Sequence, residues 1–164
     1  MNTSPAQFDE AEVAASPEEI WAWLANSQAM LRWAPMIVAT TGGVQSAGAE
    51  RSCTVEWKGK RDEVSERCVE CDPTRRIAWI QTRGGMTGLY HEFRFGFSLF
   101  PVGPHKTRLR MEHSARPRHA LAWLFERLLL RRMLRGLRRS ILHELKCLAE
   151  RESAPGKVAA ARSA

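Results

Sequence analysis

Two histidines are the residues whose type and placement most suggest chemistry. His91 and His113 each fall in phase with the apolar residues of a stretch that alternates like a strand. A histidine in an apolar pocket has a lowered pKa and can accept a proton near neutral pH. Removing a proton next to a carbonyl begins aldol-type cyclisation or dehydration. We therefore expect the two side chains to face each other across a hairpin as candidate catalytic bases, with a structural core role as the alternative.

A second set of residues is suited to lining an apolar cavity. Small-molecule sites are mostly apolar clefts with a few polar groups. The same side chains could equally fill a core, because lining and core share one face of a sheet. Gln81, with Arg83 on the same strand, could anchor a carboxylate or a carbonyl. The candidate ligand-binding residues are Trp57, Trp79, Gln81, Phe93, Phe95, Met111 and Trp123.

Metal and nucleotide chemistry find little support in the sequence. Cys68 and Cys71 have C-x-x-C spacing, but they lie in an expected strand, where residues three apart point to opposite faces. A zinc site would also need a second ligand pair of similar spacing. No phosphate-binding glycine loop, Ser-His-Asp spacing or His-x-x-x-His pair is present. We expect structural cysteines, no metal and no cofactor.

Length and composition indicate one soluble domain. The chain has 164 residues, of which 44% are hydrophobic and 26% charged, and no stretch is long and apolar enough for a membrane span. The first 19 residues are acidic and lack the basic-then-apolar order of a signal peptide. We expect a cytoplasmic protein.

The element order is a strand, two short helices, six consecutive strands and a long helix. Ser16, Pro17 and Glu19 form the signature of a capped helix start. The alternation of apolar and polar residues predicts an antiparallel sheet with one apolar face. The expected strands are 8–14, 36–41, 51–58, 62–71, 76–82, 88–100 and 106–113.

The long helix, expected at 117–151, has an apolar stripe that suits the open face of this sheet. The stripe consists of Trp123, Leu130, Met133, Leu134, Leu137, Ile141, Leu145 and Leu148. On the opposite side, where we expect contact with water, lie Arg131, Arg132, Arg135, Arg138 and Arg139.

The start of this helix carries a second apolar face, and the net charge of +7 is concentrated in the same helix. An apolar face beside cations is typical of a helix that lies on an anionic membrane. A homodimer contact, another partner, or a cover from residues 34–48 would explain the face equally well. Nucleic acid is not expected, because the outward face of the sheet offers few aromatic residues for stacking. The second face contains Leu121, Leu124, Phe125, Leu128 and Leu129.

Four local motifs, in this order and spacing, resemble the START-like (SRPBCC) superfamily and its polyketide cyclase, dehydrase and lipid transport branch. They lie at 13–21, 33–35, 72–79 and 144–150, and they correspond to a helix entry, a helix stop, a turn and a helix end. The resemblance implies an α+β helix-grip fold, in which a curved antiparallel sheet of about seven strands wraps around the long C-terminal helix. It would span 1–151, and we expect 152–164 to be a disordered tail.

The resemblance also implies a hydrophobic cavity between the sheet and the long helix. The leading expectation is a protein that binds or carries a lipid, quinone or polyketide-like molecule there. A polyketide cyclase or dehydrase with a histidine base is one alternative. A membrane- or partner-binding module that acts through the basic helix is another. The sequence leaves open whether the protein is an enzyme.

Overall fold

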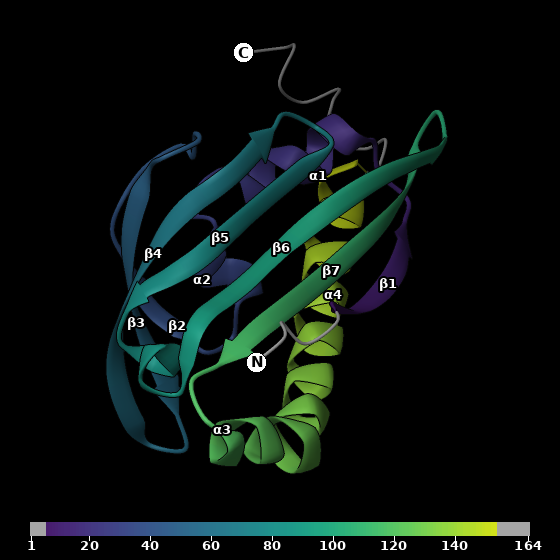
Figure 1. The fold of residues 1–164 in the computed structure, drawn as a ribbon. Helices are drawn as coiled ribbons and strands as arrows, with labels where there is room; N and C mark the ends of the chain where they lie inside the picture. The colour runs from purple at the N-terminus through teal and green to yellow at the C-terminus, as the bar shows by residue number, and fades with distance from the viewer. Residues whose placement is uncertain (1–5, 154–164) are drawn as a thin grey trace.

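The structure, a computed structural model that describes residues 6–153, has seven strands, two short α-helices, one short 3₁₀ helix and a long interrupted helix (Figure 1). The strands are β1 (Gln7–Val13), β2 (Ile37–Thr40), β3 (Glu50–Trp57), β4 (Lys60–Asp72), β5 (Arg76–Arg83), β6 (Tyr90–Gly103) and β7 (Lys106–Pro117). The helices are α1 (Pro17–Leu24), α2 (Met30–Trp33), η1 (Gly85–Gly88), α3 (Ala120–Phe125), η2 (Glu126–Leu130) and α4 (Arg131–Ser153).

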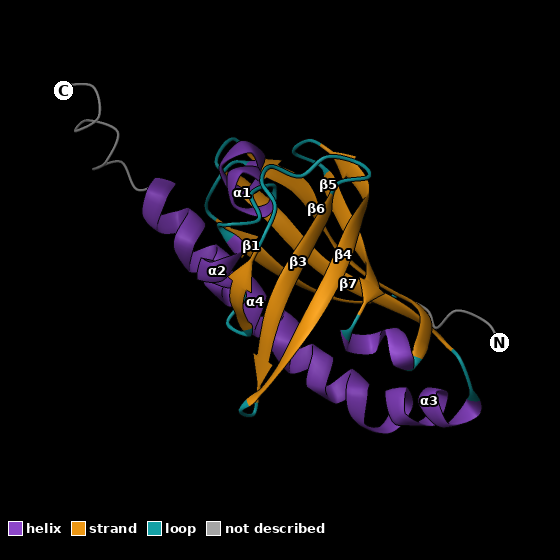
Figure 2. Ribbon diagram, turned by 90° about the vertical axis from the view of Figure 1, so that its left-hand side faces the viewer, coloured by secondary structure: helices purple, strands orange, loops and turns teal. Residues whose placement is uncertain are grey.

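The seven strands form one antiparallel sheet with the order β1-β7-β6-β5-β4-β3-β2. The first strand therefore pairs with the last, and the strands between them form a meander. Figures 1 and 2 show α4 lying across one face of this sheet. This arrangement confirms the predicted helix-grip fold.

The junction between β1 and α1 shows why the chain folds this way locally. The Ser16 hydroxyl accepts a hydrogen bond from the Glu19 amide at 3.3 Å, and the Glu19 carboxylate accepts one from the Ser16 amide at 2.7 Å. Pro17 occupies the first helical position. The predicted capping box is thus present, and it begins α1 directly beyond the end of β1.

The main core lies between the sheet and the helices α1, α2 and α4. Its buried side chains alternate along the strands and repeat every three or four residues along α4, as the sequence pattern predicts. They include Val13, Ile20, Leu24, Trp33, Ile77, Trp79, Phe97, Leu109, Ile141 and Leu145.

The long helix differs from its predicted form. The strand β7 runs on to Pro117, so the helix begins at Ala120 rather than at 117. Between α3 and α4 the turns widen into the π-helical segment η2. Glu152 and Ser153, which were expected in the tail, belong to α4. The rest of the tail, 154–164, lies outside the described residues.

The two cysteines of the C-x-x-C pair do not lie on opposite faces. A β-bulge between Cys68 and Glu70 inserts one residue into β4, so Cys68 lies in the core and Cys71 packs against the same core. Both thiols are free, and burial raises the pKa of Cys68 to about 11. Within 6–153, no group of three or more His, Cys, Asp or Glu residues is arranged to hold a metal ion. No helix in that range is long and apolar enough to cross a membrane.

Candidate ligand-binding site

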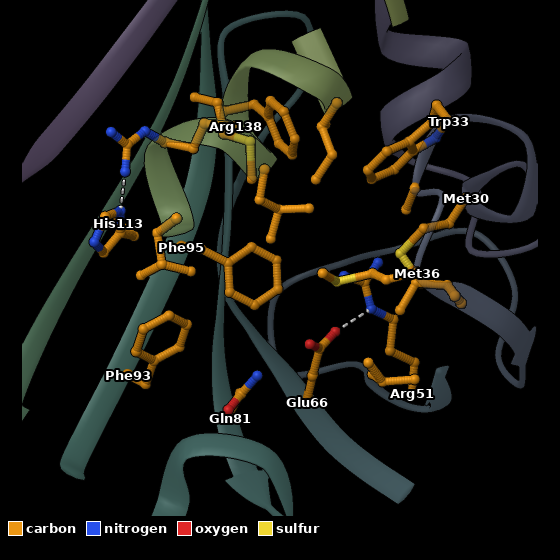
Figure 3. A pocket seen from close by; sticks show the side chains of 18 residues that line it. Met30, Trp33, Met36, Arg51, Glu66, Gln81, Phe93, Phe95, His113 and Arg138 are labelled. Carbon is orange, nitrogen blue, oxygen red and sulfur yellow. Dashed lines mark hydrogen bonds and ion pairs between the residues drawn. The ribbon is translucent and has the colours of Figure 1, made fainter. Parts of the chain in front are cut away.

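A cavity of about 110 Å³ lies between the sheet and the helices α2 and α4 (Figure 3). Most of its wall is apolar, but five polar side chains interrupt it. The apolar wall includes Met30, Trp33, Met36, Phe95, Met111, Leu137 and Ile141, and the polar side chains are Arg51, Glu66, Gln81, His113 and Arg138.

A second hollow of about 230 Å³ adjoins the first and continues toward the start of α4. The two share Met36, Val55, Gln81, Phe93, Leu134 and Leu137, and the second extends to Trp57, Met86, Leu130 and Met133. Taken together, they reach the lower end of the volumes typical of small-molecule sites, roughly 300 to 1,000 Å³.

A buried ion pair forms one side of the cavity. The Arg51 side chain on β3 is 1% exposed, and its Nε donates a hydrogen bond to the Glu66 carboxylate on β4 at 2.8 Å. The Arg51 guanidinium also lies 4.1 Å from the centre of the Trp79 ring. Its Nη1 and Nη2 are buried and have no hydrogen-bond partner among the described residues. A buried N–H group without a partner is destabilising, so these nitrogens are suited to an acceptor brought by a ligand.

Arg51 and Glu66 are not among the predicted site residues, although the sequence contains a signal for them. Arg51 lies in phase with Cys53 and Val55 on the apolar face of β3, and Glu66 lies in phase with Val64 on β4. A charged residue within an apolar alternation is rarely buried unless it is paired. Opposite charges in phase on two adjacent strands were therefore the available clue.

A second buried network lies across the cavity, with Phe95 between the two (Figure 3). The Arg138 Nη1 donates to the His113 Nδ1 at 2.7 Å, and the Arg138 Nε donates to the Asp9 carboxylate at 2.7 Å. The prediction that Arg138 faces water is wrong: it is 3% exposed, because Asp9 on β1 and His113 on β7 both bind its guanidinium.

The same network determines the state of His113. Burial and the nearby positive charges of Arg138 and Arg131 lower its pKa to about 4. Since Nδ1 accepts from Arg138, the proton of the neutral ring belongs on Nε2. In this arrangement His113 offers the donor Nε2–H, and it could act as a base only after Arg138 released Nδ1.

Of the other predicted ligand-binding residues, five line at least one of the two hollows and two do not. Gln81, Phe93, Phe95 and Met111 lie in the cavity wall, and Trp57, 43% exposed, lies at the second hollow.

The expectation that two tryptophans line the cavity is wrong. Trp79 is fully buried in the core, where it stacks on Phe95, and its Nε1 donates to Gln45 at 3.1 Å. Trp123 is 43% exposed on α3, with the Arg127 guanidinium 5.4 Å from its ring centre.

The predicted pairing of the two histidines is also wrong. A β-bulge between Tyr90 and Glu92 turns Tyr90 inward and leaves His91 exposed, with its Nδ1 3.4 Å from the Arg118 guanidinium. In the register of β6 and β7, His113 lies opposite Phe95 instead. Only His113 of the pair reaches the cavity wall.

Known structures share this fold. The Zhui aromatase/cyclase from a Streptomyces species aligns with a TM-score of 0.78 and 18% identity, over 95% of this chain and 99% of that one. Norcoclaurine synthase from Thalictrum flavum aligns with a TM-score of 0.73 and 15% identity, over 93% of this chain and 98% of that one. A START superfamily protein from Mycobacterium smegmatis aligns with a TM-score of 0.68 and 18% identity, over 87% of this chain and 98% of that one.

A comparison with curated proteins finds no match. The model of the family described as polyketide cyclase/dehydrase and lipid transport matches residues 7–150, which include the whole sheet and nearly all of α4. The chain therefore belongs to the polyketide cyclase/dehydrase and lipid transport family.

Proposed function

We propose that this protein binds a hydrophobic small molecule that carries acceptor oxygens, such as a lipid, quinone or polyketide-like compound, and acts as its carrier. The observation that supports the proposal most directly is the Arg51 guanidinium. It is buried in the wall of a mostly apolar cavity, and two of its nitrogens lack a hydrogen-bond partner among the described residues.

The two hollows suit different parts of such a ligand. The first contains Arg51, so it would take the carboxylate or carbonyl end. The second, toward Met86, Leu130 and Met133, would take the apolar end. Gln81 lies where the hollows meet; its Oε1 accepts from the Met86 amide at 2.9 Å, which leaves its Nε2 as a donor for the ligand.

The first experiment is native mass spectrometry of the purified protein, followed by organic extraction of whatever is released. A stoichiometric amphipathic molecule with carbonyl or carboxylate oxygens is expected. A co-purified hydrocarbon without acceptor oxygens would contradict the assignment of Arg51.

A defined probe then tests Arg51 directly. We expect 2-naphthoate to raise the melting temperature more than its methyl ester does. The double variant Arg51→Met/Glu66→Met should abolish this preference while it keeps the fold, because an apolar pair can replace a buried ion pair with little loss of stability. The surface pair Arg61 and Glu56, 2.7 Å apart, provides the matched double-methionine control. A cavity variant that still prefers the carboxylate would rule out Arg51 as the anchor.

An enzymatic role is the second candidate, and His113 in the cavity wall favours it. As a polyketide cyclase or dehydrase, the protein would use the His113 Nε2–H to polarise a carbonyl, or use Nδ1 as a base once Arg138 moved away. The test is turnover of a candidate polyketide by the parent and by His113→Asn. Turnover that disappears while naphthoate binding persists supports the enzyme, whereas a parent protein without turnover supports the carrier.

A further inference from the structure

We propose that the protein docks on anionic lipid bilayers through the α3–η2 patch, a surface of exposed leucines and arginines at the start of the long helix. Figures 1 and 2 show this segment at one end of the molecule. Its apolar members are Leu121, Leu124, Phe125, Leu128 and Leu129, and its cationic members are Arg127, Arg132 and Arg135.

The geometry of the helix explains why these leucines are exposed. Only every fourth residue, Ala122, Glu126 and Leu130, is buried between 120 and 130, and this narrow stripe leaves the remaining side chains outside. Leu121 is 71% exposed and Leu128 is 66% exposed. Isolated apolar side chains are common on surfaces, but several large ones on adjacent turns mark an interaction site.

The charge around the patch has one sign. Residues 114–143 contain eight arginines and one acid, Glu126, which is buried. On the sheet, several exposed or half-buried arginines have acidic partners: Arg110 pairs with Glu10 at 2.7 Å, and Arg61 pairs with Glu56 at 2.7 Å. In contrast, Arg132 and Arg135 form no ion pair with any described residue. An apolar face rimmed by unpaired cations complements the headgroups and acyl chains of an anionic bilayer.

A second copy of the chain fits this patch less well. A symmetric dimer contact joins the same surface of two copies, so the arginines of one copy would lie beside those of the other. Within the segment 114–143 no exposed acidic residue offsets that repulsion. A bilayer with anionic headgroups supplies the missing charge.

The patch also adjoins the second hollow. Met133 is 42% exposed, and together with Leu130 it lines that hollow directly behind η2. Docking would therefore bring the mouth of the hollow next to the lipid, where an apolar molecule could pass without crossing water. Docking itself is independent of the proposed function, because it requires only the outer face of the helix.

Vesicle co-sedimentation tests the proposal on the full chain. We expect binding to phosphatidylcholine vesicles that contain phosphatidylglycerol and at least about tenfold weaker binding to phosphatidylcholine alone, with a strong loss at high salt. Leu128→Ser/Leu129→Ser and Arg132→Glu/Arg135→Glu should each weaken binding at least about tenfold without lowering the melting temperature, since all four side chains are exposed.

The control is Arg75→Glu/Arg108→Glu, which makes the same change of charge at exposed positions next to the β4–β5 and β6–β7 turns. Figure 1 shows these turns at the opposite end of the sheet from α3. This variant should bind vesicles much more tightly than Arg132→Glu/Arg135→Glu. An equal loss of vesicle binding in both double arginine variants would show that binding depends only on net charge, and it would overturn the assignment of binding to the patch. A dimer in solution that Leu128→Ser/Leu129→Ser dissociates would also overturn the proposal, by assigning the patch to a second copy.

Discussion

At the scale of single residues, the site depends on two buried charge clusters, of which one joins distant parts of the chain and the other joins two adjacent strands. Arg138 binds Asp9, 129 positions away, and Arg51 binds Glu66 on the next strand. On a helical wheel Arg138 lies at the edge of the apolar stripe, next to Leu145, and its positive charge is the reason that exposure was predicted. Burial of a charge depends on a partner, and a one-dimensional pattern does not show which partner the fold supplies. This is why Phe93, Phe95 and Met111 could be predicted in the wall and the network of Arg138 could not, whereas the in-phase charges of Arg51 and Glu66 did carry a signal.

The buried His113 predicts an acid sensitivity. Its pKa falls from 6.5 to about 4 on folding, so between these pH values the unfolded chain binds more protons than the folded one. The stability contributed by the neutral ring is complete above pH 6.5 and is lost as the pH falls toward 4. The loss over this window should be at most about 3 kcal/mol. Urea melts of the parent and of His113→Asn between pH 7 and 4.5 should show a flatter pH dependence in the variant.

His91→Asn is the control, because it removes an imidazole from an exposed position on the neighbouring strand. Its pH dependence should follow that of the parent. If the stability of His113→Asn depended on pH as the parent's does, His113 would bind protons equally in the folded and unfolded states. Its ring could then not be held neutral by accepting a hydrogen bond from Arg138.

At the scale of elements, the sequence predicted all seven strands, the α1 cap and the long helix, because each has its own local pattern. The errors lie at irregularities. Bulges at Tyr90/Glu92 and Cys68/Glu70 each insert one residue, which exchanges the two faces of a strand from that point on. The residue types at these positions do not signal an insertion, and for this reason His91 and Cys71 were placed on the wrong faces.

The contact between α4 and β1 should depend on one carboxylate. Asp9 binds Arg138 and also Arg139, whose Nε lies 3.2 Å from its Oδ1. Asp9→Ala would leave the Arg138 guanidinium buried without its anionic partner, and we expect a loss of roughly 3 kcal/mol in the free energy of unfolding. Glu10→Ala removes a half-buried partner of Arg110 from the next position and should lose less than about 1 kcal/mol. Equal losses in the two variants, measured by urea denaturation, would show that the buried network does not hold the helix.

The turn from β5 into η1 should depend on Gly84. Its φ is +70°, and an added Cβ would lie 2.0 Å from the Glu63 carbonyl oxygen, a backbone atom that cannot move aside. Gly84→Ala should therefore destabilise the protein by at least about 2 kcal/mol. Gly88, at the end of the same short helix, has open space around its Cβ position, so Gly88→Ala should be neutral within about 0.5 kcal/mol. Thermal melts of both variants would measure these changes in stability, and a Gly84→Ala protein as stable as the parent would show that the turn can rearrange.

At the scale of the whole molecule, the sheet and α4 could be predicted, but the cavity between them could not. The same apolar residues can fill a core or surround a hollow, and the difference depends on how closely helix and sheet approach. Here the filled part of the core lies near Ile77, Leu109 and Leu145, which line neither hollow, and the hollows lie toward the start of α4. The periodicity of a sequence predicts which face of a helix or strand is apolar, but it does not predict the distance between the helix and the sheet.

This distinction can be tested by filling the space. Val55 lines both hollows, so Val55→Phe would place a ring where a ligand is expected. If the hollows are empty space in the folded protein, the added ring gains contacts, and the unfolding free energy should rise by about 1 kcal/mol or stay unchanged. The affinity for 2-naphthoate should fall at least about tenfold in the same variant. Val69→Phe, at an exposed position on β4, is the matched control and should leave binding unchanged. A Val55→Phe protein that loses 1 to 3 kcal/mol, as overpacked cores do, would mean that the helix and sheet close on each other and that ligand binding requires them to separate.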